Sequence, residues 1–161
     1  MRAPFKNGFY AGLLVAFILG IWLVRLWSAE NQVRLHSVHL IQQTQNRNWT
    51  AVESFLATDY HDVWGDDRAE LLQRLRRIGR YLFSLTITAS DARIRVTGTK
   101  ASWKGRLHVD GQGEAAAEIA PRVNSLTTPF ELTWRKESWK PWDWKLTQVA
   151  NESLEIPREG L

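Results

Sequence analysis

The residues best suited to proton transfer lie in one short stretch, DYHD at positions 59–62. A carboxylate enclosed by apolar side chains has a raised pKa and acts as a general base, and a nearby phenol donates a hydrogen bond to the substrate. Successive side chains of an extended segment point to opposite faces, so Asp62 shares a face with Tyr60 and His61 does not. This disfavours a His–Asp pair on one substrate. An enzyme would therefore use Asp62 or Asp59 as the base and Tyr60 or Tyr81 as the hydrogen-bond donor.

Structural roles compete with these catalytic ones. Without a polar partner in the same cavity, Asp62 is expected to be solvated or to cap backbone N–H groups. His36 and His39 lie three residues apart, a spacing that can share a metal ion, but no third ligand with suitable spacing accompanies them. The sequence therefore predicts no metal site and no cofactor.

Nine tryptophans are the most unusual feature of the composition, and four of them lie between positions 134 and 144. Alternation places Trp134, Trp142 and Trp144 on the inward face, where large rings fill a small core. An aromatic platform for a sugar or a lipid is the alternative. Trp139 falls in a predicted turn and is the member of the group that invites a role in recognition.

The basic character of the chain is concentrated around its first apolar run. The formal net charge is +4, and three of the basic residues, Arg2, Lys6 and Arg25, flank that run. The remaining 18 Lys and Arg nearly balance the charge of the 17 Asp and Glu, and no block of like charge occurs in the sequence. We therefore expect no nucleic-acid partner, which would require a basic patch. The absence of cysteine excludes disulfides and thiolate metal sites.

The apolar run itself predicts a membrane anchor. Residues 8–24 carry no charge, and the run extends to Trp27 if Arg25 directs its guanidinium to the membrane surface. About 20 helical residues span about 30 Å, the thickness of the hydrocarbon core. A cleaved signal peptide is the alternative, but cleavage after Ala29 would place Trp27 where a small residue is required. The sequence thus favours an uncleaved transmembrane signal anchor at 8–27.

The charges on the two flanks predict the orientation of this anchor. Basic residues and the amino terminus precede the run, whereas acids and bases are mixed after it, which favours a cytoplasmic N-terminus. We expect a single-pass protein of the inner (cytoplasmic) membrane with a short cytoplasmic segment at 1–7. The domain at 28–161, with its core at about 30–156, is expected to be periplasmic or otherwise extracytoplasmic.

Three helices are predicted after the anchor. Residues 29–45 have an apolar stripe at helical spacing. Thr50 and Glu53 have the spacing of a capping box and predict the start of a short second helix. Asp67 and Glu70 have the same spacing at the start of a third helix. The apolar stripe of this third helix consists of Leu71, Leu72, Leu75, Ile78 and Leu82.

From residue 85 the apolar period changes from 3.6 to 2, which predicts strands. A loop is expected between about residues 111 and 128. The order of elements, helices first and antiparallel strands afterwards, predicts an α+β fold with the helices packed on one face of the sheet. The predicted strand segments are 85–89, 94–96, 103–109, 130–134 and 142–146.

The run NWTAVESFLATDYHDVWGDDRAELLQRL, followed by strands ending in FELTWRKESWKPWDWKL, resembles the nuclear transport factor 2-like superfamily, also called SnoaL-like or cystatin-like cone proteins. The resemblance covers about residues 30–156 and suggests a membrane-anchored bacterial member. Its marks are Trp49 before the second helix, Leu56-x-x-Asp59-Tyr60 at its end, a short strand at 61–64 and the capped third helix.

The resemblance implies a curved, mainly antiparallel sheet curled around three helices, with a cone-shaped cavity. The superfamily contains isomerases, dehydratases, cyclases and epoxide hydrolases as well as non-catalytic domains, so the fold names no reaction. The base position of the isomerases falls near Trp64 when counted without a gap, and on Asp62 with one gap, so their motif is incomplete here. The implied ligand pocket would be lined by Tyr60, Trp64, Trp103, Leu107, Phe130, Trp134 and Trp144.

We therefore expect a membrane-tethered, non-catalytic module that binds a small apolar ligand or a protein partner. The alternative is a small-molecule isomerase, dehydratase or cyclase that uses a cone-lining carboxylate as general base. The outward positions of the strands are polar and lean basic, so an acidic protein would bind there. Like charges on that face predict a monomer or a weak, salt-sensitive homodimer.

Overall fold

The structure is a computed structural model that describes residues 4–155 of the 161, apart from the side chains of residues 4–9, 11, 25 and 26. The predicted segment 1–7 and the end of the predicted domain 28–161 thus lie partly outside the described residues. The elements are α1 (Pro4–Leu26), α2 (Ala29–Gln45), α3 (Trp49–Phe55), α4 (Arg68–Gly79), β1 (Ser84–Thr97), β2 (Lys100–Gln112), α5 (Glu114–Asn124), β3 (Phe130–Lys136) and β4 (Trp144–Ala150).

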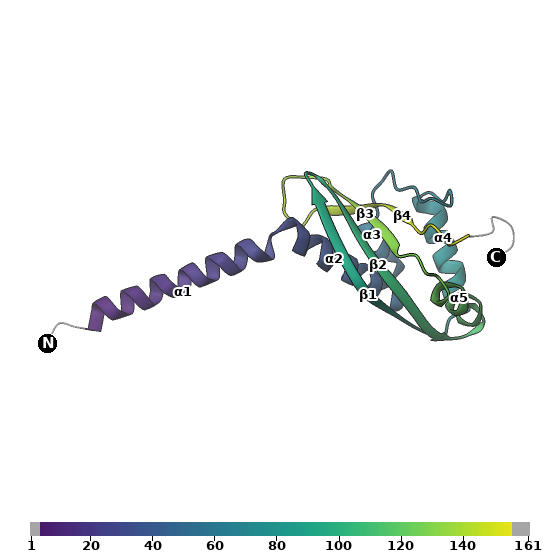
Figure 1. Cartoon of the computed structure of the whole chain (residues 1–161), viewed down its shortest axis with the longest axis horizontal. Helices are drawn as coiled ribbons and strands as arrows, with labels where there is room; N and C mark the ends of the chain where they lie inside the picture. Colours follow the sequence, from purple (N-terminus) through teal and green to yellow (C-terminus); the bar gives the residue numbers. More distant parts are fainter. Residues whose placement is uncertain (1–3, 156–161) are drawn as a thin grey trace.

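Helix α1 extends away from the rest of the molecule, which forms one α+β domain (Figure 1). Within the described part of the chain, no helix taken singly has the length and apolar composition needed to cross a membrane. Gly12–Val24 and Ala29–Gln45 meet those requirements together, as a pair bent by 62°. The anchor at 8–27 therefore remains a prediction.

The helix boundaries follow from capping. The predicted helix 29–45 is confirmed as α2. The capping box that starts α4 is also confirmed, because Asp67 accepts from the Glu70 N–H and Glu70 accepts from the Asp67 N–H. The prediction of Thr50 as the cap of α3 is wrong. Asn48 caps that helix by accepting from the Ala51 N–H at 3.3 Å, so α3 starts two residues earlier than predicted.

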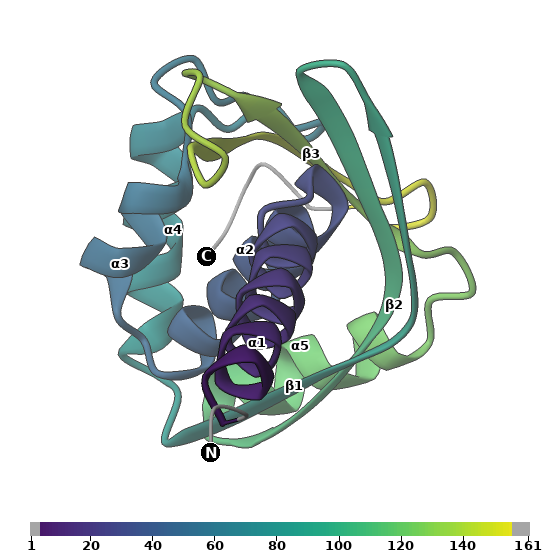
Figure 2. The same cartoon turned by 90° about the vertical axis from the view of Figure 1, so that its left-hand side faces the viewer.

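The sheet is antiparallel with strand order β1-β2-β3-β4. The predicted segments 85–89 and 94–96 belong to one long strand, β1, whose register shifts between Ser90 and Arg93. Asp91 has a φ of 54° within this irregularity. Such a bulge bends a strand and increases its twist, and the sheet accordingly curls around α2 (Figure 2).

Two predictions about secondary structure are corrected. The predicted loop from 111 to 128 contains α5, so within residues 4–155 four helices, not three, follow α1 and accompany the sheet. The run of alanines from Ala115 to Ala117 has high helix propensity. The Asn124 amide then fixes the helix end to β2, because it donates to the Val109 carbonyl and accepts from the Val109 N–H, both at 2.8 Å.

The predicted short strand at 61–64 is the second correction, since only isolated bridges occur there. The chain from Ala57 to Val63 nevertheless runs alongside β4, because three of its N–H groups donate to β4 carbonyls. It cannot continue as a strand, because the Asp62 N–H turns back to the Asp66 carbonyl and Gly65 has a φ of 96°. The three bonds to β4 are Ala57 to Leu146 at 2.9 Å, His61 to Thr147 at 3.1 Å and Val63 to Val149 at 3.3 Å.

The inner face of the sheet and the helices enclose one apolar core. Burial confirms the predicted alternation along β2, β3 and β4. The inward position predicted for Trp142 is wrong, because Trp142 precedes β4 and is half exposed. The core joins α2, α3 and α4 to the sheet through Val33, Leu40, Val52, Leu56, Tyr60, Leu72, Ala101, Trp103, Leu132, Trp134, Trp144 and Leu146.

Candidate functional site

The segment between α3 and α4 contains the predicted catalytic residues Asp59, Tyr60 and Asp62, whereas the alternative donor Tyr81 follows α4 and is exposed. Burial alternates along the segment as expected: Tyr60 is 2% exposed and Asp62 is 4% exposed, whereas His61 and Val63 are exposed. Asp62 and Tyr60 therefore share the inner face. His61 lies on the opposite face and cannot assist either of them.

Asp62 uses its carboxylate to hold the turn that leads into α4. Its Oδ1 accepts from the Trp64 N–H at 3.0 Å and from the Asp66 N–H at 2.8 Å. The Asp62 N–H donates in return to the Asp66 carbonyl at 3.0 Å. Short acidic side chains commonly stabilise turns in this way. The geometry thus corresponds to the structural role considered for Asp62.

Tyr60 presents a polar atom to the same interior. Its hydroxyl is buried and has no hydrogen-bond partner among the described residues. Burial, and then the negative charges of Asp62 and Asp66, raise the pKa of the Tyr60 phenol far above its ordinary value. The hydroxyl therefore stays protonated and can serve only as a hydrogen-bond donor or acceptor.

Asp66 is a residue that the sequence reasoning missed. Its Oδ1 accepts from the Arg74 guanidinium at 2.8 Å. Burial raises the pKa of the Asp66 carboxyl, Arg74 opposes that rise, and the charge of Asp62 adds to it. A signal for this pair exists in the sequence, because Arg74 lies on α4 among the leucines that face the core. Tyr60, Asp62, Asp66 and Arg74 together form one small polar group beside the core.

Asp59 does not belong to this group. Its two carboxylate oxygens each accept from the Arg135 guanidinium at 2.8 Å, a bidentate pair. Arg135 also donates to Glu137 at 2.6 Å. The hydrogen bonds from Arg135 lower the pKa of Asp59, whose side chain is otherwise exposed. The predicted catalytic residues are thus divided between the inner polar group and an outer ion-pair network.

Of the predicted pocket residues, Tyr60, Trp103, Trp134 and Trp144 belong to the apolar core, and Leu107 packs against it. Trp103, Trp134 and Trp144 are among the largest fully buried side chains. A β-carbon at Gly105 would lie only 2.6 Å from the Trp103 ring, so the glycine makes room for that indole. Phe130 is buried as well, whereas Leu107 and Trp64 are partly buried. An open hollow on α1 contains none of the predicted residues and is lined by Ala16, Phe17, Gly20, Ile21, Val24 and Ser28.

The indole N–H groups of these tryptophans differ in whether they have a hydrogen-bond acceptor. Trp144 Nε1 donates to the Pro141 carbonyl at 3.0 Å, and Trp64 Nε1 donates to the Leu154 carbonyl at 2.7 Å. Trp134 Nε1 is buried and has no partner among the described residues. Its indole instead meets the His36 ring edge-on, with centroids 5.8 Å apart.

His36 is a half-buried structural histidine. Its Nδ1 lies 2.8 Å from the Gln32 carbonyl, and its ring also contacts Phe55 edge-on. Burial lowers the pKa of His36. His39 is exposed. Among the described residues, no three His, Cys, Asp or Glu side chains are arranged to hold a metal ion.

Comparison with known proteins supports the fold and no particular activity. No family model and no curated protein matches the sequence. A proposed dehydratase of the nuclear transport factor 2-like family from Streptomyces avermitilis matches with a TM-score of 0.58 and 16% identity, covering 76% of this chain and 93% of the other. A nuclear transport factor 2-like protein of unknown function in nutrient uptake, from Rhodospirillum rubrum, has the same TM-score, 19% identity and coverages of 76% and 98%.

A proposed aromatic ring hydroxylase from Novosphingobium aromaticivorans matches with a TM-score of 0.60 and 11% identity, over 79% of this chain and 90% of the other. At these identities the similarity defines the fold alone. The chain adopts the nuclear transport factor 2-like, or cystatin-like, α+β fold, as the sequence resemblance implied.

Proposed function

We propose that this protein is a membrane-tethered, non-catalytic binding module whose partner is a protein with an acidic surface. One observation carries the non-catalytic part. Each carboxylate that was a candidate base is engaged in a structural contact: Asp62 with two backbone N–H groups, and Asp59 with Arg135. A general base must also reach a substrate proton, and Asp62 is 4% exposed, while the bonds from Arg135 lower the pKa and hence the basicity of Asp59.

The outer face of the sheet supports a protein partner. Arg93 and Arg95 on β1 and Arg106 on β2 are exposed, and none of them forms an ion pair with a described residue. Beside them, Lys104 pairs with Glu131 at 2.9 Å. Unpaired arginines on a solvent-exposed sheet are suited to bidentate binding of carboxylates. The tryptophan-filled interior offers less to a small ligand than this face offers to an acidic protein.

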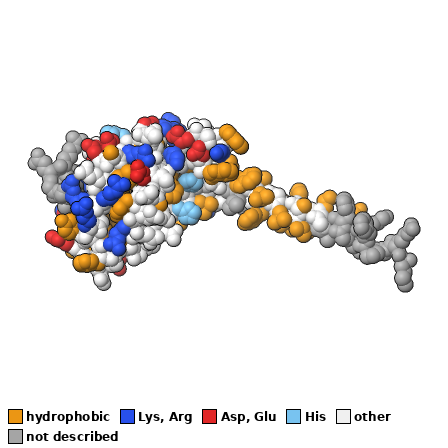
Figure 3. All heavy atoms as spheres, turned by 180° about the vertical axis from the view of Figure 1, so that it is seen from behind, with side chains coloured by type: hydrophobic (Ala, Val, Ile, Leu, Met, Phe, Trp, Pro, Cys, Tyr) orange, Lys and Arg blue, Asp and Glu red, His pale blue; other side chains and the backbone are white. Residues whose placement is uncertain are grey.

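The tether is supported by α1. Most large apolar side chains along its described part are more than half exposed, among them Leu14, Phe17 and Val24. Figure 3 shows hydrophobic side chains along this helix and at the adjoining end of the domain. A continuous apolar surface of this kind marks an interaction site in proteins, and the uncharged run 8–24 fits a bilayer.

Site-specific photo-cross-linking in native membranes tests the function. The full chain would carry p-benzoylphenylalanine at position 95 on the sheet face, or at position 122 on α5 as the matched control, since Arg122 is also exposed but pairs with Glu118. We expect a protein adduct from position 95 that disappears at high salt and in an R93E/R106E background. Equal adducts from both positions, or none from position 95, would contradict the proposed partner surface.

One observation favours a second candidate, a small-molecule enzyme of the isomerase, dehydratase or cyclase type. The unpartnered Tyr60 hydroxyl lies within the electrostatic influence of Asp62 and Asp66. Removing a buried hydroxyl that has no partner relieves its desolvation cost, so the non-catalytic proposal predicts that Tyr60→Phe leaves stability unchanged or raises it by up to about 1 kcal/mol. A loss of stability of that size would show that the hydroxyl has a polar partner and would favour the second candidate.

A further inference from the structure

Two exposed tryptophans lie in the loop between β3 and β4. Trp139 is 84% exposed and Trp142 is 53% exposed. Isolated exposed apolar residues are common, but indoles are the costliest of them to leave in water. Neither side chain contributes to the buried core described above. The two exposed indoles are therefore candidates for contact with a binding partner.

The loop holds these indoles on a defined turn. The Glu137 N–H donates to the Asp143 carbonyl at 2.9 Å, and the Asp143 N–H donates to the Lys140 carbonyl at 3.3 Å. Trp144 Nε1 fixes the same turn from the core side through the Pro141 carbonyl. The indoles are thus presented by a hydrogen-bonded hairpin end.

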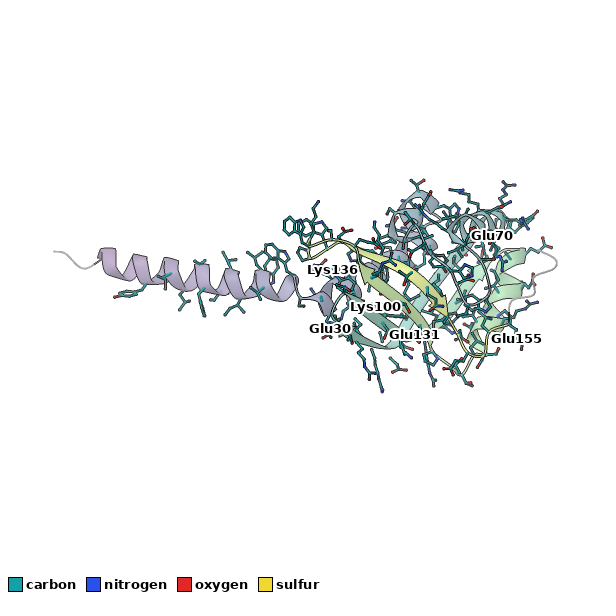
Figure 4. All side chains as sticks on the ribbon, turned by 90° about the horizontal axis from the view of Figure 1, so that it is seen from above. Glu30, Glu70, Lys100, Glu131, Lys136 and Glu155 are labelled. Atoms are coloured by element: carbon teal, nitrogen blue, oxygen red, sulfur yellow. The ribbon has the colours of Figure 1, made fainter. Side chains whose placement is uncertain are left out.

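This hairpin end lies at the end of the domain that adjoins α1. The Lys136 N–H donates to the Thr99 carbonyl at 2.8 Å, which brings the β1–β2 turn beside it. Figure 4 shows Glu30, Lys100 and Lys136 together at this end, with Glu70 and Glu155 at the opposite end. Figure 1 shows the same arrangement of the two hairpin ends and the start of α2.

The connection between α1 and the domain is short. Only Trp27 and Ser28 separate α1 from α2. Two residues span at most about 7 Å. If α1 crosses a bilayer, the surface that adjoins the start of α2 must lie at the headgroup level, and this surface includes the β3–β4 loop.

Exposed indoles and lysines at this end are typical of a membrane-interface surface, and its acids Glu30 and Glu137 pair with Arg34 and Arg135. Trp27 is half exposed and joins Trp139 and Trp142. Lys100, Lys136 and Lys140 accompany the indoles, and none of the three forms an ion pair with a described residue. Indoles concentrate at the headgroup level, and lysines there are attracted to anionic lipids.

We propose that the β3–β4 loop inserts Trp139 and Trp142 into the headgroup region of the bilayer that carries α1, so that the domain lies against the membrane. This inference rests on the proposed tether. It gives the domain a fixed orientation, in which the free arginines of the sheet face remain available to a partner beside the membrane.

The absence of cysteine allows a direct test with single-cysteine variants of the full chain in vesicles of phosphatidylcholine and phosphatidylglycerol. An environment-sensitive fluorophore would be attached to W139C. Phe83 supplies the matched control, because it is 79% exposed and directly precedes β1, whose other end pairs with the β2 residues at the α1 end. A third variant, F17C, reports on α1 itself.

We expect spin-labelled lipids with shallow labels to quench the fluorophore at position 139 several-fold more than that at position 83, and deep labels to quench position 17. Water-like emission at 139 with deep quenching at 17 would overturn the inference and leave the tether intact. Equal quenching at 139 and 83 would indicate non-specific adsorption and would also overturn the inference. Absence of quenching at 17 would overturn the tether and, with it, the inference.

Discussion

Trp139 and Trp144 lie five residues apart in one hairpin and have opposite surroundings. Trp144 is the first residue of β4, faces the core and donates to the Pro141 carbonyl. Trp139 lies on the turn and projects into solvent. Strand alternation directs the Trp144 indole into the core, whereas the turn leaves the Trp139 indole outside it. Packing explains the tryptophan inside the cone, whereas packing does not explain Trp139, for which we propose contact with the membrane interface.

The two acids of the DYHD stretch show the same contrast. Asp62 is enclosed and serves two backbone N–H groups, whereas Asp59 is exposed and pairs with Arg135. Both acids are engaged, but only loss of Asp62 would leave buried N–H groups without an acceptor. Residue type alone therefore identifies neither a base nor a ligand-binding aromatic.

The largest expected effect separates the two tryptophans. Trp144→Ala should lower the free energy of unfolding by about 3–5 kcal/mol, because it removes a fully buried ring from the core. Trp139→Ala should change it by no more than about 0.5 kcal/mol, as is usual for exposed sites. Urea denaturation of the full chain in detergent micelles measures both. Similar losses at the two positions would show that Trp139 packs against the domain.

A smaller effect is expected at Asp62. Asp62→Ala should cost about 1–3 kcal/mol, since the N–H groups of Trp64 and Asp66 lose their acceptor. Asp62→Asn keeps an acceptor oxygen and should cost clearly less. Asp59→Ala breaks an exposed pair and should have the smallest effect of the three. Equal losses for the alanine and asparagine variants would show that Asp62 acts through its charge and would reopen a catalytic role.

The smallest effect concerns pH and His36. Because burial lowers its pKa, folded His36 takes up a proton less readily than unfolded His36, whose ordinary value is 6.5. The contribution of neutral His36 to the free energy of unfolding is therefore fully present above pH 6.5. It is lost as the pH falls from 6.5 towards the pKa of the folded state. His36→Gln should flatten the pH dependence of stability in this window. His39→Gln, on the exposed side of the same helix, should retain it, and an unchanged profile in His36→Gln would contradict the burial effect.

Local signals in the sequence predicted much of the fold. The bounds of α2, the capping box of α4 and the inward and outward positions of β2 and β3 all depend on neighbouring residues, and all are confirmed. Asn48 and Thr50 can both cap a helix, so sequence did not distinguish them. Helix α5 was missed because Pro121 within it, and Gly111 and Gly113 before it, are residues typical of loops.

The candidate site was less predictable because its contacts are distant in sequence. Asp59 and Arg135 are 76 residues apart, and no neighbouring residue in the sequence predicts that they pair. The inward side of Asp62 was predicted, but its two backbone donors depend on the turn at Gly65. Trp142 was placed inward by extending β4 backwards, whereas the strand begins at Trp144 and its register shifts between Thr133 and Trp134 of β3.

The tether is the central claim, since the proposed location of the domain and the membrane-facing loop both depend on it. Protease treatment of spheroplasts that express the full chain, followed by N-terminal sequencing of the untreated mature protein, tests it most directly. We predict that the protease digests the domain and that the mature protein retains Met1 or Arg2. A mature N-terminus near Glu30 would show that the apolar run is removed, and protection of the domain from protease would show that it lies on the cytoplasmic side.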